Sequence, residues 1–325
     1  MQPIFRNVAV VGTGAMGRGI AQMAAQAGAT VWLFDAQPGA ADAARAALEG
    51  TWNSLVAKQR MATEAAADCL SRLRIATGMT DLAACDLVVE AIVERLEIKQ
   101  KVFAELEGIV GPEAVLATNT SSLSVTAIGA ALKRPERFAG WHFFNPVPLM
   151  KVVEVIAGLK TDAAVCQRLD AFARAFGHTP VMAQDTPGFI VNHAGRGYGT
   201  EALRIVGESV SDFATIDRIL KDQLGFRLGP FELMDLTALD VSHPVMESIY
   251  HQYFEEPRYR PSVITAQRLA GGVVGKKVGE GFYAYDKGVA QVPAEPAVPE
   301  VTELPPVWVS PKAARRAELY QLLKD

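Results

Sequence analysis

Residues 8–22 read VAVVGTGAMGRGIAQ and decide the expected fold of this 325-residue chain. Four apolar residues open the stretch, as in a short strand that is buried on both faces. Glycines 12, 14 and 17 follow with the spacing G-x-G-x-x-G, and a run of small and apolar residues suited to a helix comes next. Gly12 suits a tight turn, Gly14 lets a pyrophosphate approach the backbone, and Gly17 lets the helix pack on the strand. The stretch therefore predicts a strand, a phosphate-binding turn and a helix.

A carboxylate at the end of the next predicted strand, residues 30–34, bears on the choice of cofactor. Asp35 follows that strand, where a carboxylate accepts hydrogen bonds from ribose hydroxyls and repels a 2′-phosphate. No arginine follows in residues 36–38, so NAD is expected rather than NADP. The residues expected to line this part of the cofactor site are Gly12, Gly14, Ala15, Met16, Gly17 and Asp35. The alternative is a tight structural turn followed by a solvated aspartate.

Strand-like and helix-like segments alternate through the first half of the chain. Further strands are expected at residues 86–90, 114–117, 138–142, 152–156 and 180–182. The Ala-rich stretch at residues 39–73 predicts either one helix or a two-helix arm. Alternating units of this size predict an α/β fold with a Rossmann-type doubly wound, mostly parallel sheet.

The pattern becomes helical after Asp185-Thr186-Pro187-Gly188. Pro187 suits the first turn of a helix, with Asp185 or Thr186 as its cap. We therefore expect an NAD-binding domain over residues 1–185, with the helical arm at about 39–73. A second, all-α C-terminal domain is expected over residues 186–286.

Residues 287–325 are expected to form a Pro-rich linker and a terminal helix. The linker prolines are Pro293, Pro296, Pro299, Pro305, Pro306 and Pro311. Lys312–Asp325 is the predicted helix, with its leucines on one stripe. Either this helix docks back on the body or the chain stops inside a further domain.

Composition and charge narrow the classes of function. The net charge is −4 and no polybasic run occurs, so nucleic acid and anionic membranes are poor partners. Cys69, Cys85 and Cys166 are widely spaced, which argues against a disulfide framework and against a metal site. No apolar run reaches the roughly 18 residues of a membrane span. The first strand begins near Asn7, which leaves no room for a signal peptide, so a cytoplasmic protein is expected.

Polar residues follow neighbouring predicted strands at the edge where ligands bind in such a sheet. Asn119–Ser122 follow one strand, and His142 and Asn145 end the next. The turn-forming residues 145–148 allow the chain to fold back and set Glu154 beside His142. An imidazole backed by a carboxylate accepts the proton of a secondary alcohol as hydride leaves the same carbon. The alternatives are a core histidine, a serine that caps a helix and a glutamate that faces solvent.

Taken together, these segments resemble the 3-hydroxyacyl-CoA dehydrogenase family, particularly its bacterial 3-hydroxybutyryl-CoA dehydrogenase-like members. The stretches that carry the likeness run from about residue 6 to 286 and are VAVVGTGAMGRGIAQ, DLVVEAIVERLEIK, NTSSLSV, RFAGWHFFNPVPLMKVVEVI, DTPGFIVN, GPFELMDLTALDV and GKKVGEGFYAY. The resemblance implies an NAD-dependent, reversible oxidation of (S)-3-hydroxyacyl-CoA to 3-ketoacyl-CoA, as in the β-oxidation of fatty acids. It also implies a homodimer formed through the helical domain.

The resemblance assigns roles to individual residues. It implies that His142 is the catalytic base and Glu154 its partner. It implies that Ser121 donates a hydrogen bond to the substrate near the nicotinamide, and that Asn192 reaches the substrate from the helical domain. The residues implied near the cofactor are Glu94, Lys99, Ser121, Asn145 and Lys277. Those implied near coenzyme A are Ser54 and Lys58, in the arm.

The chain departs from the family pattern after Asn192, because His193–Gly199 contains three glycines where the family more often has arginine and apolar residues. Each glycine weakens a helix by roughly 1 kcal/mol relative to alanine. The stretch is expected either to allow close helix packing or to open space for the acyl group. Two other functions stay open: an NAD-binding structural or sensor protein of the same fold, and a β-hydroxyacid dehydrogenase that does not use CoA. The latter would have a catalytic lysine in the helical domain.

Overall fold

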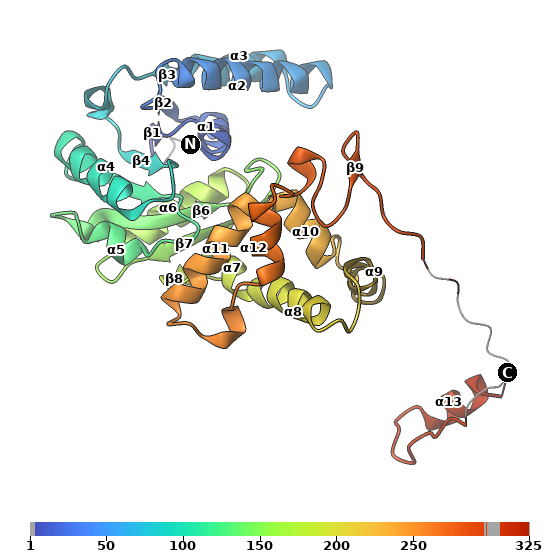
Figure 1. The fold of residues 1–325 in the computed structure, drawn as a ribbon. Helices are drawn as coiled ribbons and strands as arrows, with labels where there is room; N and C mark the ends of the chain where they lie inside the picture. Colours follow the sequence, from blue (N-terminus) through green and yellow to red (C-terminus); the bar gives the residue numbers. More distant parts are fainter. Residues whose placement is uncertain (1–3, 296, 298–305, 325) are drawn as a thin grey trace. The chain divides into compact units, whose positions relative to one another are not determined.

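The computed structural model describes residues 4–295, 297 and 306–324. The chain divides into two compact units, residues 1–290 and residues 291–325. The first unit holds both the sheet and the helices that follow it (Figure 1). The expected domain division near residue 185 falls within this unit and stays a prediction.

An eight-stranded sheet forms the centre of the first unit, with the strand order β3-β2-β1-β4-β5-β6-β7-β8. The strands are β1 (Asn7–Val11), β2 (Thr30–Phe34), β3 (Leu73–Ile75), β4 (Leu87–Glu90), β5 (Val115–Thr118), β6 (Phe138–Phe143), β7 (Val152–Ala157) and β8 (Thr179–Gln184). All neighbours are parallel except β6 and β7. The order runs outward in both directions from β1 and β4. This confirms the doubly wound sheet and puts the topological switch point between these two strands.

Helices cover both faces of the sheet (Figure 1). One face carries α1 (Ala15–Gln26), α2 (Ala40–Ala57), α3 (Thr63–Ser71) and α6 (Ala163–Ala175), and the other carries α4 (Leu96–Ile109) and α5 (Val125–Gly129). Successive side chains of β1 point to opposite faces, so Val8 and Val10 join the first apolar cluster and Ala9 and Val11 the second. Burial on both faces explains why β1 is apolar throughout.

The predicted arm contains two helices, α2 and α3, which lie side by side (Figure 1). Strand β3 follows them and lies outside the strands expected from the sequence. It has three residues, pairs with β2 at the edge of the sheet, and exposes its central Arg74. A strand this short carries too few residues for an alternating pattern to be recognised.

The region after β8 is helical, as predicted. Its helices are α7 (Val191–Ala194), α8 (Arg196–Gly207), α9 (Phe213–Leu224), α10 (Pro230–Thr237), α11 (Leu239–Gln252) and α12 (Val263–Ala270). Short 3₁₀ helices and a small hairpin complete the unit: η1 (Met79–Leu82), η2 (Pro135–Arg137), η3 (Pro257–Tyr259), η4 (Lys276–Val278), β9 (Tyr285–Asp286) and β10 (Val289–Ala290).

The predicted helix start at Pro187, with Asp185 or Thr186 as its cap, was wrong, because residues 187–190 form a turn. The carboxylate of Asp185 instead accepts hydrogen bonds from the N–H groups of Val125 at 2.8 Å and Thr126 at 2.7 Å, at the start of α5. The next helix after Asp185 begins only at Val191. A carboxylate can serve any helix start that lies near it in space, and the sequence pattern shows only the helix that follows in the chain.

In the second unit, α13 (Arg316–Leu322) lies within the stretch predicted as the terminal helix but is shorter. Pro296, Pro299 and Pro305 of the predicted linker lie outside the described residues. None of the helices in the described part of the chain has the length and apolar character needed to cross a membrane.

Candidate active site

The turn between β1 and α1 has the geometry that the glycine spacing requires. Gly12 has a φ of +94°, which residues with a side chain rarely adopt. A Cβ added at Gly17 would lie 1.8 Å from the carbonyl oxygen of Gly12, so α1 could not pack there with any larger residue. A Cβ at Gly14 would meet no atom within 4 Å, and the first turn of α1 has no acidic residue and no side-chain cap. This open helix start fits a pyrophosphate.

Asp35 is held at the end of β2 by the same turn. Its Oδ2 accepts hydrogen bonds from the N–H of Thr13 at 2.7 Å and from the Thr13 hydroxyl at 2.8 Å. Burial raises the pKa of Asp35, but hydrogen bonds from the N–H of Gln37 and from Thr13 outweigh burial and lower the pKa below its ordinary value. The charged carboxylate fits the ribose of NAD, which carries free hydroxyls, better than a 2′-phosphate.

The antiparallel pairing of β6 and β7 brings His142 and Glu154 face to face. They are register partners, and Nδ1 of His142 lies 2.6 Å from Oε2 of Glu154. Both are buried, with exposures of 4% and 0%. Asn119 accepts a hydrogen bond from the N–H of Phe143 at 2.9 Å, which holds the end of β5 beside His142. Since a carboxylate accepts the Nδ1 proton, Nε2 is the nitrogen left to act as an acceptor.

The second oxygen of Glu154 reaches the helical region. Oε1 accepts hydrogen bonds from the N–H groups of Ile190 and Val191, each at 2.9 Å, at the start of α7. Burial raises the pKa of Glu154, but hydrogen bonds from His142 and from these N–H groups more than offset it, so the pKa lies below its ordinary value. Glu154 is therefore charged at neutral pH and ties the sheet to the helix that carries Asn192.

The loop formed by residues 119–122 also meets the helical region. The side-chain amide of Asn192 donates a hydrogen bond to the carbonyl of Ser121 at 3.2 Å. From α11, the amide of Gln252 donates to the carbonyl of Ser122 at 2.7 Å. The structure thus brings Ser121 and Asn192 together, and their shared role at the substrate stays a prediction.

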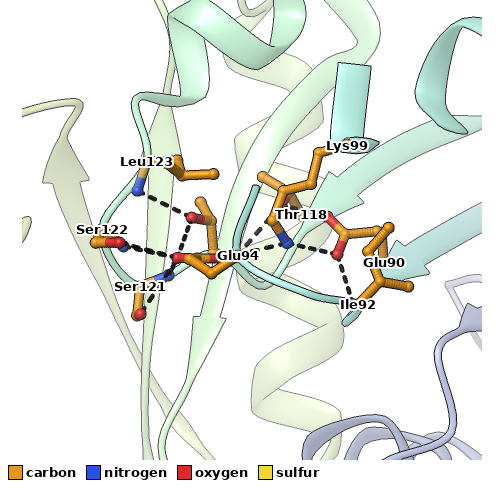
Figure 2. A network of polar contacts seen from close by, with 9 residues as sticks. Glu90, Ile92, Glu94, Lys99, Thr118, Ser121, Ser122 and Leu123 are labelled. Atoms are coloured by element: carbon orange, nitrogen blue, oxygen red, sulfur yellow. Dashed lines mark hydrogen bonds and ion pairs between the residues drawn. The ribbon is translucent and has the colours of Figure 1, made fainter. Parts of the chain in front are cut away.

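Glu94 holds this loop from the other side, as Figure 2 shows. Its Oε1 accepts hydrogen bonds from the hydroxyl of Thr120 at 2.6 Å and from the N–H groups of Ser121 at 2.8 Å and Ser122 at 3.0 Å. The hydroxyl of Ser121 lies 3.3 Å from the same oxygen. Burial raises the pKa of Glu94, but the charge of Lys99 and these hydrogen bonds lower it below its ordinary value.

Lys99 is buried between two carboxylates (Figure 2). Its side chain is 1% exposed, and Nζ lies 2.6 Å from Glu90 and 3.3 Å from Glu94. Glu90, at the end of β4, also accepts a hydrogen bond from the hydroxyl of Thr118 at 2.7 Å. The charge of Lys99 is therefore taken up by these two carboxylates, and its expected place near the cofactor stays a prediction. Sequence reasoning missed Glu90 and Thr118, although two polar residues ending apolar strands were a usable signal.

The remaining candidates form no hydrogen bond or ion pair with this cluster in the described part of the chain. Ser54 and Lys58 are exposed on the arm, at α2 and its C-terminal end. Lys277, on η4, forms an ion pair with Asp240 of α11. Asn145 lines a cavity of about 300 Å³ between α1, α2 and the segment after β6.

His193, the first departure from the family pattern, packs inside the helical region. Its Nδ1 lies 2.8 Å from the hydroxyl of Tyr253, and Nε2 lies 3.4 Å from the hydroxyl of Tyr259. The ring is half-buried between the two tyrosines. This histidine thus joins α7 to the end of α11 and to η3.

Two sequence families match consecutive parts of the chain. Residues 7–186 match "3-hydroxyacyl-CoA dehydrogenase, NAD binding domain", and residues 188–285 match "3-hydroxyacyl-CoA dehydrogenase, C-terminal domain". A "3-hydroxyadipyl-CoA dehydrogenase" of Escherichia coli K12 is 44% identical over 86% of this chain and 58% of its own length. A "Probable 3-hydroxybutyryl-CoA dehydrogenase" of Deinococcus radiodurans is 41% identical over 85% of this chain and 99% of its own length.

A crystal structure of 3-hydroxybutyryl-CoA dehydrogenase from Escherichia coli K12 superposes with a TM-score of 0.86 and 41% identity. The superposition covers 93% of this chain and 62% of the E. coli chain. The present chain therefore spans less than two thirds of the length of both E. coli proteins. The matches extend over the glycine turn, the His142–Glu154 pair and the helical region. The chain belongs to the 3-hydroxyacyl-CoA dehydrogenase family.

Proposed function

We propose that this protein oxidises (S)-3-hydroxyacyl-CoA thioesters to 3-ketoacyl-CoA with NAD, in a reversible reaction of fatty-acid metabolism. The observation that carries the proposal is the buried pair of His142 and Glu154, whose Nδ1 and Oε2 lie 2.6 Å apart. The pair lies next to the loop of residues 119–122, in which the Ser121 carbonyl accepts a hydrogen bond from Asn192. An imidazole held in one tautomer by a carboxylate is the group that a secondary alcohol needs for proton removal.

When bound, NAD supplies the acceptor for the hydride that leaves C3 of the substrate. His142 takes the proton of the 3-hydroxyl on Nε2, and the C3–O bond becomes a carbonyl. Glu154 keeps the proton of the neutral imidazole on Nδ1 and stabilises the imidazolium that forms, because its carboxylate is charged and buried. In the reverse direction the imidazolium returns its proton to the oxygen.

Ser121 and Asn192 orient the substrate in this proposal. The Ser121 hydroxyl is only weakly engaged, at 3.3 Å from Glu94, so it is available to donate to the substrate oxygen. Asn192 approaches from the helical region and contacts the thioester carbonyl or the hydroxyl. Glu94 is proposed to position the loop, with Lys99 and Glu90 fixing Glu94 in turn.

Coenzyme A is proposed to lie along the arm. Ser54 on α2 and Lys58 at the C-terminal end of this helix are exposed, and a lysine ammonium there can meet a phosphate. The cavity that Asn145 lines lies between α1, α2 and the segment after β6, so Asn145 is proposed to contact the cofactor on the side of the arm. Lys277 is proposed to reach the cofactor from η4.

We also propose a cytoplasmic homodimer that uses the helical domain, residues 186–286, for assembly. The family matches, which change at residues 186 and 188, support the division near residue 185. Exposed apolar side chains in this domain support the interface. They lie on α9, α10 and α11 and in the segment between α9 and α10, and are Ile219, Leu224, Phe226, Leu228, Leu233, Leu236 and Val241.

The direct test mixes the protein with NADH and acetoacetyl-CoA and follows the absorbance of the reduced nicotinamide. We expect turnover by the wild type, and His142→Gln should abolish it while NADH binding is kept. An inactive wild type that still binds NADH would favour the structural or sensor protein. Turnover of free 3-hydroxyacids, without binding of CoA, would favour the dehydrogenase that does not use CoA.

A further inference from the structure

A cavity of about 300 Å³ lies between α1, α2 and the segment after β6. Arg18 and Gln22 of α1 both line it, and residues four apart share one face of a helix. Gly19 lines it as well, and a Cβ added there would lie 2.7 Å from the Cβ of Val147. Close packing of α1 on the segment after β6 therefore fixes this wall. The volume lies at the lower end of small-molecule sites, which span roughly 300–1,000 Å³.

Gln22 is a buried amide without a hydrogen-bond partner. The residue is 8% exposed and lines the cavity, and its side chain forms no hydrogen bond with any of the described residues. A side-chain amide carries two donor hydrogens and an acceptor oxygen, and burying these groups unpaired is costly. Gln22 therefore points to a ligand that brings hydrogen-bonding groups of its own into the cavity.

Arg18 is the only charged residue among the described residues that line the cavity. Its side chain is exposed and forms no ion pair with a carboxylate in the described part of the chain. Leu48, Val147 and two prolines supply apolar walls. The cavity thus combines an apolar surface, an unpaired buried amide and an exposed cation, which suits a slender ligand with amide groups and an anionic end.

The cavity also lies between the places that the proposed function gives to the two ends of the substrate. Thr51 lines it from α2, three residues before Ser54 of the arm. Asn145 lines it from the segment after β6, three residues after His142. In coenzyme A a pantetheine chain joins the phosphates to the thioester, and it carries two amide groups and a pair of methyl groups. A chain of this kind would bridge the arm and the histidine.

We propose that this cavity holds the pantetheine chain of coenzyme A, with Gln22 bound to one of its amide groups and Arg18 to the diphosphate. The proposal rests on the acyl-CoA dehydrogenase function and adds residues of α1 to the substrate site. The planar guanidinium matches a phosphate with parallel hydrogen bonds. NAD carries a diphosphate too, which is expected at the first turn of α1, so the test has to separate the two sources.

The kinetic test compares acetoacetyl-CoA with acetoacetyl-pantetheine, which lacks the diphosphate and the nucleotide. Arg18→Met should lower kcat/KM for acetoacetyl-CoA by about tenfold, the lower end for hydrogen bonds to a charged group, and leave acetoacetyl-pantetheine unchanged. Gln22→Leu should lower kcat/KM for both esters by about 2- to 10-fold, the range for one net hydrogen bond. In calorimetry, both variants should bind coenzyme A more weakly by similar factors and bind NADH as the wild type does.

Two matched controls should keep all of these values. Gln26→Leu lies one turn further along α1, where Gln26 is exposed and outside the cavity. Arg174→Met removes a charge from α6, where the side chain is 61% exposed and pairs with Asp170.

The outcomes separate the site from the proposed function. Variants that match the wild type with both esters and with coenzyme A overturn the site and leave the function intact. Weaker binding of NADH by Arg18→Met, with coenzyme A binding kept, assigns the arginine to NAD and also overturns it. A wild type that neither binds coenzyme A nor reduces either ester refutes the function and the site together. If Gln22→Leu fails to fold, the Arg18 comparison decides, because Arg18 is exposed and lies outside the core.

Discussion

Replacement of Glu154 by glutamine changes the charge of the proposed site with little change of shape. The amide oxygen can still accept hydrogen bonds from the N–H groups of Ile190 and Val191, which now lie 2.9 Å from Oε1. The amide nitrogen then faces Nδ1 of His142, where a carboxylate oxygen lies at 2.6 Å. Because both the amide and Nδ1–H would be donors, the imidazole must move its proton to Nε2.

Two effects set the size of the loss in activity. In the wrong tautomer Nε2 cannot accept the substrate proton, and loss of general-base help costs about 10²–10⁴ in rate. The charge of Glu154 also stabilises the imidazolium, by about 4 kcal/mol for charges roughly 4 Å apart at an effective dielectric constant near 20. The loss of general-base catalysis and the loss of imidazolium stabilisation both describe the same proton transfer to His142, so their contributions are not added. We therefore expect kcat to fall by about 10³, with NADH binding kept.

Stability should follow the pKa of Glu154. Because its folded pKa lies below the ordinary 4.5, ionised Glu154 stabilises the native state above that pH, and the stabilisation is lost as the pH falls through the folded value. Glu154→Gln should therefore unfold at lower urea concentration at pH 7, and the gap from the wild type should narrow below about pH 4.

The assay is steady-state reduction of acetoacetyl-CoA, with urea unfolding of each variant at several pH values. Glu136→Gln is the matched control, because Glu136 is a glutamate with 46% exposure that pairs with Arg134 on the surface. The control should keep both kcat and stability. A folded Glu154→Gln protein whose kcat stays within fivefold of the wild type would refute the role given to the carboxylate.

Three further changes test other parts of the site. Gly17→Ala should destabilise the protein by about 1–3 kcal/mol and weaken NADH binding, because its Cβ would lie 1.8 Å from a backbone oxygen; unchanged thermal unfolding and NADH titration would contradict this. Asp35→Asn should lower the preference for NAD over NADP by about tenfold, since one charge that repels a 2′-phosphate is removed, and competition titration measures the ratio. Lys99→Met should cost about 3–5 kcal/mol in urea unfolding, because it leaves two carboxylates without their buried cation; a loss below 1 kcal/mol would show that the network contributes little.

The parts of the fold that follow from local pattern were predictable. The run of β1, its glycine turn and α1 are consecutive in the chain, and each glycine has a steric reason that the structure bears out at Gly12 and Gly17. The pairing of His142 with Glu154 was also predictable, because a short turn between two strands leaves few ways to arrange them. Both inferences use neighbours in sequence, where spacing limits geometry.

The polar network behind the loop could not be predicted in the same way. Lys99 and Glu90 are nine residues apart, but Thr118 and Ser121 join them from the next strand, and their positions depend on the packing of α4 on the sheet. From the sequence alone, an isolated lysine near a cofactor site is most simply assigned to bind a phosphate of the ligand. The structure gives Lys99 two carboxylates instead, because a lysine with 1% exposure must be paired. Asp185 shows the same limit at a helix start.

Backbone N–H groups decide where an anionic ligand can be held in this site. Two sets of them lie after strand ends, one in the first turn of α1 and one in the loop after β5. In the loop, the N–H groups of Ser121 and Ser122 already donate to Glu94, and its charge would repel a phosphate. The first turn of α1 has no acidic residue and no side-chain cap, so its N–H groups are free to bind phosphate. We therefore expect the pyrophosphate at α1. In the proposed function, the loop then presents the Ser121 hydroxyl to a neutral oxygen, which is what a substrate carbonyl or hydroxyl offers.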